Sequence, residues 1–508
     1  MKKLYQLFDR SCGNQWFPLF FVLIAAVFLL FYSFSTSPLF LNDGMDSAVF
    51  KTMGLAVLKG KIVYVDIFDH KGPILYFINA LGQWLIPGRL GIFLLQVIGL
   101  SVSLLYMFRI SRLFVNNALS LFAVLLALFI FGGIIQEGNQ CEEWMMYFFC
   151  IAFYYVLVYF VSKSDKQHPL KYSFVYGFCF AVTFFIRPND AVGVVGGIMM
   201  GLTIWLIYKK DFKGLALNVL CFMGGAAVVT IPVLYYFAYH QALGDLWYGL
   251  IGFNKSYSGG GKQLIISVFQ SEKTALALVF ISLVLLVREV DRYRIILLVL
   301  CPVIFIEWIM MGSSYFHHYY ISILPIYLLY LLFVILLLVR KQKKWNLIVL
   351  SMGILFLSAH IGTASTINLA TKNIIYRLVT FAHGRSYYRI YDFYAETDSL
   401  LSIIPENEID SVWNYNLKWS GGDVSSCSAF SSLWHKGIVQ CNLITYGSNA
   451  DLRKKDDLSV KKPLWIVLDG NEIDENHDIK SINYISSYYR FVAKTDTTIC
   501  NLNLYRRK

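Results

Sequence analysis

The sequence lacks several features that would assign it at once to a familiar class of protein. Its nine cysteines show no metal-ligand spacing, which argues against a zinc module. The apolar run near the N-terminus is longer than the core of a signal peptide and has no small-residue cleavage site, so we expect a retained membrane helix. The chain also shows no internal repeat, although transporters are usually built from inverted repeats.

Long apolar runs are the main feature of the sequence. Of its 508 residues only 15% are charged, whereas 57% are hydrophobic and 17% are aromatic. Many runs are long enough to cross a hydrocarbon core of about 30 Å at about 1.5 Å per residue. We therefore predict an α-helical polytopic membrane protein with about eleven transmembrane helices. They are expected at residues 16–40, 90–108, 118–135, 144–161, 172–186, 191–208, 215–239, 274–287, 295–311, 319–339 and 345–367.

The basic residues set the expected orientation. A net charge of +12 would suggest nucleic acid in a soluble protein, but here the basic residues gather in short turns between apolar runs, so we expect no nucleic-acid partner. A cytoplasmic N-terminus makes every cytoplasmic turn basic, and an odd helix count puts the C-terminus outside. We predict a multi-pass protein of the cell membrane. The basic turns hold Arg109, Arg112, Lys163, Lys166, Lys171, Lys209, Lys210, Lys213, Arg288, Arg292, Arg294, Arg340, Lys341, Lys343 and Lys344.

The composition divides the chain near residue 371. Residues 1–370 form the predicted membrane domain, and residues 371–508 are more polar and predict a small extracytoplasmic α/β domain. In it we expect a helix over 394–404, strands over 411–415 and 464–468, and a hairpin over 491–505. Cys427 and Cys441 could pair outside the cytoplasm or remain free thiols.

The segment between the first two apolar runs is the most unusual part of the membrane domain. Residues 42–73 carry four acids, four lysines and a histidine, and we expect a loop. An ionised side chain at mid-bilayer costs about 2.5 to 3.5 kcal/mol even on the mildest scale, so such a loop must face water. We expect an active site there, beside interfacial elements over residues 74–86 and 244–263.

Charged side chains from several outer turns could act together. Asp46, Glu142 and Glu143 are candidate catalytic acids, because a carboxyl group beside an apolar wall can deprotonate an alcohol. Lys71 and His70 could neutralise a departing phosphate. For any one acid, a solvated anchor at a helix end is an equally good interpretation.

Two further residues have open roles. Arg187 could grip a phosphate or serve as an interfacial anchor, as arginines at helix ends commonly do. His318 could touch a ligand or belong with the tyrosines around it to an aromatic belt. His317 and His318 alone do not make a zinc site, because structural zinc takes four ligands.

Five short motifs in order along the chain resemble those of a known superfamily. They are DSAVF (46–50), GKIVYVDIFDHKGP (60–73), GNQCEEW (138–144), IRPND (186–190) and HHYYISILP (317–325). Together they resemble the GT-C membrane glycosyltransferases, in the branch of the protein O-mannosyltransferases and the bacterial lipid A aminoarabinose transferase. The similarity covers most of the predicted membrane part.

The resemblance implies roles for particular residues. It implies a sugar linked to polyprenyl phosphate, an extracytoplasmic site, and Asp46 as the base or a metal-binding acid. It places Glu142 or Glu143 at the second acidic position and Lys71 at the donor phosphate. Asp46 stands in a DS pair where many relatives have two acids, which leaves a divalent metal ion open as a cofactor. Gly72 replaces a second proline of many relatives.

Three functions follow as hypotheses. The leading one is an inverting glycosyltransferase that uses a polyprenyl-phosphate sugar and a lipid, protein or polysaccharide acceptor among membrane lipids. A transporter or flippase of lipid-linked saccharides is the second, but charges at the outer helix ends favour an enzyme. A glycan polymerase or ligase is the third, and it would take a diphosphate-linked donor.

Overall fold

The computed structural model describes most of the membrane part and the main elements of the tail. The described residues are 17–39, 45–135, 137–162, 166–254, 317–339, 390–415, 459, 462–469, 479–495 and 501–508.

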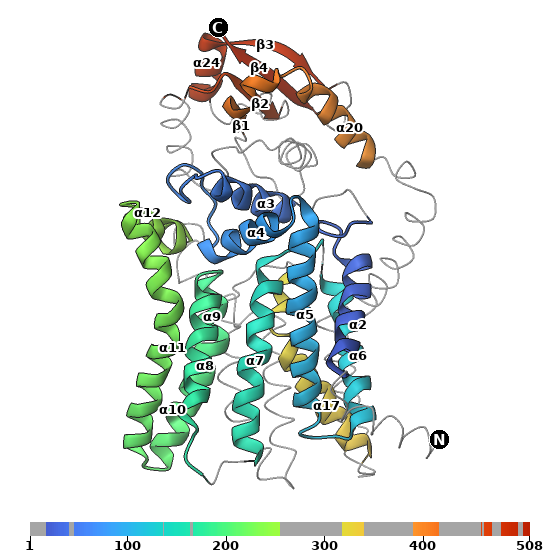
Figure 1. Cartoon of the computed structure of the whole chain (residues 1–508), viewed down its shortest axis with the longest axis vertical. Coiled ribbons are helices and arrows are strands. Elements are labelled where there is room, and N and C mark those ends of the chain that lie inside the picture. Colours follow the sequence, from blue (N-terminus) through green and yellow to red (C-terminus); the bar gives the residue numbers. More distant parts are fainter. Residues whose placement is uncertain are drawn as a thin grey trace.

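A bundle of apolar helices forms the larger part of the molecule (Figure 1). Within the described residues, five segments are long and apolar enough to cross a membrane, and α2 (Phe17–Tyr32) and α8 (Leu170–Phe184) are shorter apolar helices. The five segments are α5 (Arg89–Ser111), α6 (Asn117–Ile134), α7 (Cys141–Ser162), residues Pro188–Tyr208 and α11 (Phe212–Tyr239).

The predicted class of polytopic helical membrane protein is confirmed, and α17 (Leu324–Val339) completes the described bundle. The total of about eleven helices stays a prediction, because residues 274–287, 295–311 and 345–367 lie outside the described ranges.

Local sequence signals fix several helix ends. Asn116 Oδ1 accepts a hydrogen bond from the Leu119 N–H at 3.0 Å and caps α6. Asp211 caps α11 in the same way through the Gly214 N–H at 2.8 Å. Pro188 occupies the first turn of α9 (Pro188–Ala191), where a missing N–H costs nothing. A π-helical turn, η1 (Val192–Gly196), then joins α9 to α10 (Gly197–Tyr208).

Glycines allow α8 and α11 to pack closely. A Cβ added at Gly177 would lie 1.9 Å from the Phe222 carbonyl oxygen, and one added at Gly225 would lie 1.9 Å from that of Phe174. The two backbones therefore touch where a side chain cannot fit, as small residues permit in membrane helix pairs.

Two helices, α3 (Met45–Leu58) and α4 (Pro73–Leu85), lie across one end of the bundle (Figure 1). The loop predicted over 42–73 was wrong for residues 45–58. Ala48, Phe50, Lys51 and Met53 are all buried, so α3 has apolar neighbours on most sides and lacks the polar face that marks a surface helix. The helix expected over 74–86 is confirmed as α4.

The tail contains a four-stranded sheet in the order β1-β2-β4-β3. Strand β1 (Val412–Tyr415) runs parallel to β2 (Trp465–Asp469), while β4 (Leu502–Arg507) is antiparallel to β2 and to β3 (Tyr489–Lys494). The two predicted strands and the hairpin are confirmed. Cys427, Cys441 and the proposed boundary at residue 371 lie outside the described residues.

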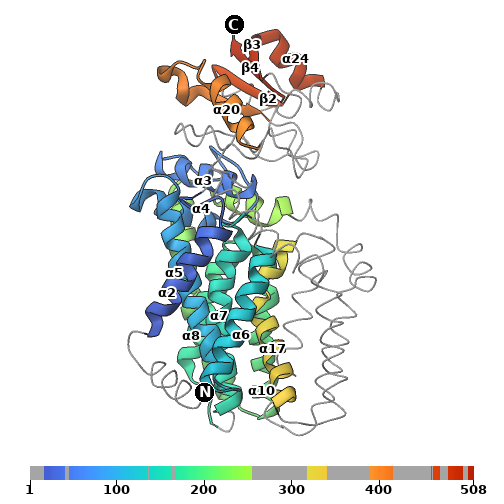
Figure 2. The same ribbon diagram turned by 90° about the vertical axis from the view of Figure 1, so that its right-hand side faces the viewer.

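Helices cover both faces of this sheet. Leu400 and Leu401 of α20 (Ile390–Leu401) pack with Val467 on one face, and Ile485 of α24 (Ile479–Tyr488) packs with Ile466 on the other. The helix predicted over 394–404 begins four residues earlier, and α24 was not predicted. Figures 1 and 2 show the sheet at the same end of the molecule as α3 and α4.

Candidate active site

Side chains from five segments lie within electrostatic reach of one another. Lys71 interacts electrostatically with Asp46 and Arg187, and Glu142 interacts with His318, Arg187 and Lys71. The structure thus brings six of the seven predicted site residues together. They come from the first turn of α3 (Asp46), the turn before α4 (His70, Lys71), the first turn of α7 (Glu142), the turn before α9 (Arg187) and the 3₁₀ helix η3, His317–Ile321 (His318).

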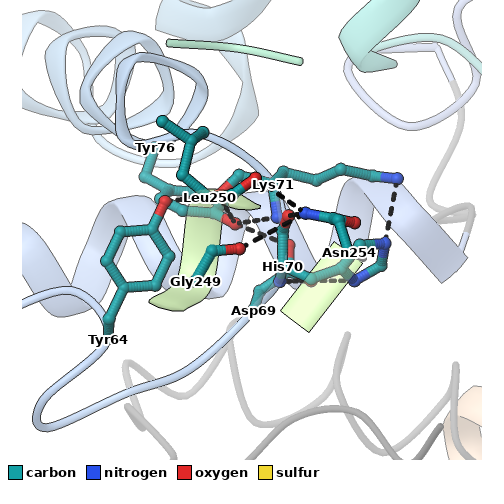
Figure 3. A network of polar contacts seen from close by, with 8 residues as sticks. All are labelled: Tyr64, Asp69, His70, Lys71, Tyr76, Gly249, Leu250 and Asn254. Atoms are coloured by element: carbon teal, nitrogen blue, oxygen red, sulfur yellow. Dashed lines mark hydrogen bonds and ion pairs between the residues drawn. The ribbon is translucent and has the colours of Figure 1, made fainter. Parts of the chain in front are cut away.

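The backbone of the turn before α4 is held by hydrogen bonds from three directions, and Figure 3 shows those from Tyr64 and Asn254. The Tyr64 hydroxyl donates to the Lys71 carbonyl at 2.5 Å, and Asn254 Nδ2 donates to the His70 carbonyl at 2.9 Å. The Gly72 N–H donates to the Ile186 carbonyl at 2.8 Å, which ties the turn to the end of α8. The position of Lys71 is therefore set by segments far apart in the chain.

Gly72 has a steric and a hydrogen-bonding reason to be glycine. A Cβ there would lie 2.0 Å from the Phe185 carbonyl oxygen, and the Gly72 N–H is already used by Ile186. Proline would add a ring to this contact and remove the donor. The departure from the second proline of many relatives thus follows from the close approach of this turn to α8.

A chain of polar contacts links Asp69, His70 and Lys71 (Figure 3). The Tyr76 hydroxyl donates to Asp69 Oδ2 at 2.8 Å, and the other carboxylate oxygen lies 3.2 Å from His70 Nδ1. Lys71 Nζ lies 3.2 Å from His70 Nε2. With Nδ1 toward the carboxylate, His70 presents Nε2 as an acceptor to the ammonium group.

The charges of this turn follow from burial and from its neighbours. Burial disfavours the charge of Asp69, but its hydrogen bond to His70 and the nearby positive groups hold the carboxyl pKa below its usual range. Burial and the Lys71 charge lower the pKa of His70, so the imidazole is neutral at pH 7. Burial opposes the charge of Lys71, yet the influence of groups that include Cys141, Tyr319 and Asp46 raises its pKa. Lys71 is the cation of this turn.

Arg187 lies in a second charged group. Its guanidinium forms an ion pair with Glu142 and lies 3.3 Å from Asp190 Oδ2, and its Cζ lies 4.2 Å from the centre of the Tyr319 ring. Burial works against this charge, but Asp190 and Glu142 raise the pKa of Arg187. Burial lowers the pKa of His318, with Glu142 and Asp46 opposing the shift.

Glu143 faces away from this group. Gln96 Nε2 donates to both of its carboxylate oxygens at 2.9 Å, the Tyr147 hydroxyl donates at 2.6 Å, and the Asn139 N–H donates at 2.9 Å. Successive residues on a helix point about 100° apart at 3.6 residues per turn, so the two adjacent acids reach different neighbours. The geometry places Glu142 toward Arg187 and Glu143 inside the bundle.

Asp46 is the half-buried acid of the group. Within the described part of the chain, its carboxylate has no hydrogen-bond or ion-pair partner, whereas Glu142 and Asp69 are engaged. It remains within electrostatic reach of Lys71, His70 and His318. Asp46 is therefore the carboxylate with acceptor capacity to spare.

Several contributors were not singled out from sequence. Tyr64 and Tyr76 flank the DHKGP motif and could have been suspected from that proximity. Asn254 lies 184 residues from the carbonyl it contacts, and no local signal marks it. In the described ranges, no group of three or more His, Cys, Asp or Glu side chains is arranged to hold a metal ion.

Comparison with known proteins places this geometry in context. A protein-family model described as the putative competence-induced protein Ccs4 N-terminal domain matches residues 15–361. No curated protein matches the chain.

Solved structures share the fold at low identity. A crystal structure of ArnT from Cupriavidus metallidurans bound to undecaprenyl phosphate matches with a TM-score of 0.59 and 11% identity, over 96% of this chain and 97% of that one. The Archaeoglobus fulgidus oligosaccharyltransferase in the apo form matches with a TM-score of 0.50 and 12% identity, over 90% of this chain and 70% of that one. The archaeal oligosaccharyltransferase AglB from the same organism, in complex with an inhibitory peptide and a dolichol-phosphate, matches with a TM-score of 0.50 and 11% identity. The match covers 97% of this chain and 74% of that one.

These structures establish a likeness of fold. The predicted resemblance to GT-C membrane glycosyltransferases is thereby confirmed at the level of the fold.

Proposed function

This chain belongs to the family of the putative competence-induced protein Ccs4 N-terminal domain, and we propose that it is a GT-C membrane glycosyltransferase. Its donor would be a sugar on a polyprenyl monophosphate, and its acceptor a hydroxyl group of a lipid, protein or polysaccharide. The observation that carries the proposal is the placement of a half-buried Asp46 within electrostatic reach of Lys71 at one end of an apolar bundle.

The proposed reaction is a single displacement. The Asp46 carboxylate accepts the proton of the acceptor hydroxyl, and the oxygen of that hydroxyl attacks C1 of the sugar. The bond from C1 to the phosphate oxygen breaks, and polyprenyl phosphate leaves. The transferred sugar then has the inverted configuration at C1. A positioned base of this kind contributes about 10² to 10⁴ in rate.

Lys71 would compensate the charge that gathers on the leaving phosphate. A preorganised cation in a place of low dielectric is worth more than one in water, and His70 holds this ammonium as a neutral acceptor. Because the phosphate leaves well once compensated, the scheme needs no separate general acid.

Arg187 and His318 are proposed to border the donor phosphate. Arg187 already faces Glu142 and Asp190, so an incoming phosphate would share its guanidinium with these carboxylates. In this scheme Glu142 sets the position of Arg187, and no step is routed through a metal ion.

The proposed orientation follows the sequence. The N-terminus would lie in the cytoplasm, and the site and the domain of residues 371–508 would lie on the extracytoplasmic side. The sheet of the tail lies at the same end of the molecule as α3 and α4 in both views, which supports this arrangement (Figures 1 and 2).

Purified protein supplied with defined undecaprenyl monophosphate and diphosphate sugars tests the proposal. We expect transfer from a monophosphate donor, a loss of at least about 100-fold with Asp46→Asn, and weaker binding of undecaprenyl phosphate with Lys71→Ala. Asp211→Asn and Lys209→Ala are matched controls, because Asp211 caps α11 and Lys209 Nζ lies 5.0 Å from the centre of the Trp205 ring, in the turn between α10 and α11.

Three results would contradict it. Full transfer by both site variants would remove Asp46 and Lys71 from the mechanism. Movement of a lipid-linked saccharide without a new glycosidic product would indicate a transporter. Use of the diphosphate donor alone would indicate a polymerase or ligase.

A further inference from the structure

Asn139 is the centre of a buried polar network next to the candidate site. It lies in the turn before α7 with a φ of 58°, a left-handed conformation that asparagine tolerates better than most residues. Its Nδ2 donates to Ser47 Oγ at 3.0 Å and to Asn79 Oδ1 at 2.9 Å, and its Oδ1 accepts from Trp144 Nε1 at 2.9 Å. The side chain of Asn139 thus joins α3, α4 and α7.

The network is anchored to the interior of the bundle. The Asn139 N–H donates to Glu143, whose carboxylate is held in turn by Gln96 and Tyr147. Asn139, Glu143 and Gln96 are fully buried. Because a broken bond in such a place leaves a desolvated polar group, each member resists displacement.

Ser47 connects this anchor to the site. It follows Asp46 directly in the first turn of α3, and its hydroxyl meets Asn139 from a position 92 residues away in the chain. The preceding turn of the chain is fixed as well, since the Ser35 N–H donates to the Glu137 carbonyl at 2.9 Å. The start of α3 is therefore tied to the same turn that leads into Glu142.

We propose that Asn139 is a positioning residue that fixes Asp46, through Ser47, relative to Lys71 and Glu142. The inference rests on the proposed function and assigns to Glu143 the task of holding Asn139. A displacement of about 1 Å at a reacting group can cost about 100-fold in rate, so this network would act on catalysis without touching substrate.

The chain offers a matched control for the test. Ser173 Oγ donates to Asn218 Oδ1 at 2.6 Å, and both residues are buried. This pair also joins a buried serine hydroxyl to an asparagine side chain, although Ser173 donates whereas Ser47 accepts. Ser173 lies in the first turn of α8, whereas Arg187 follows the last turn. Ser47→Ala and Ser173→Ala each remove one buried serine hydroxyl that forms a hydrogen bond with an asparagine side chain.

Two readouts separate positioning from a general loss of stability. The first is steady-state transfer from the undecaprenyl monophosphate sugar used by the wild type. Ser47→Ala should lower kcat about 10-fold or more and leave the donor KM within about two-fold, and Asn139→Gly, which keeps the backbone conformation, should lower kcat further. Ser173→Ala should change neither.

The second readout needs no sugar. With Asp46→Cys as a background, the rate of modification by a cationic methanethiosulfonate reagent reports how firmly residue 46 is held. Ser47→Ala should raise this rate several-fold over the Asp46→Cys background, and Ser173→Ala should not.

Equal effects of Ser47→Ala and Ser173→Ala on kcat and on the modification rate would overturn the inference. If the wild type transfers no sugar, the proposed function fails by itself, and the modification rate then decides whether Asn139 holds residue 46.

Discussion

Removal of Arg187 should destabilise the protein more than removal of its partner Glu142. The guanidinium lies between two carboxylates, with 14% of the Arg187 side chain exposed and 1% of Glu142 and of Asp190. Arg187→Met removes the guanidinium that pairs with both buried acids, and breaking a buried pair in this way costs about 3 to 5 kcal/mol. Glu142→Gln costs less, about 1 to 3 kcal/mol, because Asp190 still faces the guanidinium.

The thermal unfolding midpoint in a single detergent measures this order. The midpoint should fall most for Arg187→Met and less for Glu142→Gln. The double variant Arg187→Met with Glu142→Gln should recover part of the loss, since one of the two buried carboxylates that lost the guanidinium is now neutral. Arg109→Met is the control, because the Arg109 Cζ lies 5.4 Å from the Tyr106 ring centre in a contact worth about 0.5 to 1 kcal/mol.

The reasoning would be refuted by a different order. If Arg187→Met lowers the midpoint no further than Arg109→Met, the buried charges are not compensating one another. If the double variant is less stable than Arg187→Met alone, Glu142 stabilises the fold by a route other than this pair.

Two further predictions concern packing and pH. Gly225→Ala should cost about 1 to 3 kcal/mol because its Cβ would meet the Phe174 carbonyl, whereas Gly224→Ala, with its nearest neighbour at 3.9 Å, should be neutral; equal unfolding midpoints would contradict the close approach of α8 and α11. Burial and Lys71 hold the pKa of His70 below 6.5, so the unfolded chain binds this proton more readily and stability is lost as the pH falls below about 6.5. His70→Gln should reduce the change in the unfolding midpoint between pH 7 and pH 5. An unchanged dependence of the midpoint on pH would contradict a neutral His70.

Local patterns in the sequence were enough for the helical class, the motif order and the strands of the tail. A run of about twenty apolar residues has few alternatives to a spanning helix, because every backbone polar group must be paired inside lipid. Alternation and turn residues predicted β1, β2 and the β3–β4 hairpin. These features depend on neighbours within a few residues of one another.

The error over residues 45–58 has a physical cause. Charged residues on either side of the segment indicated a loop, and α3 itself has no polar stripe to reveal a helix. Lys51 is fully buried within it, with its Nζ donating to the Ser35 carbonyl at 2.9 Å. A lysine satisfied by a distant carbonyl cannot be told from a solvated one in sequence.

The sequence by itself determined which residue types stand at the ends of the apolar helices, since hydrophobic length and charge are properties of short segments. Only the tertiary structure decided that Glu142 faces Arg187 while Glu143 joins Asn139, and that Asn254 holds the turn of His70. The direction of a side chain and its partner depend on how whole helices pack, and the contacts that fix this packing join residues tens to hundreds of positions apart.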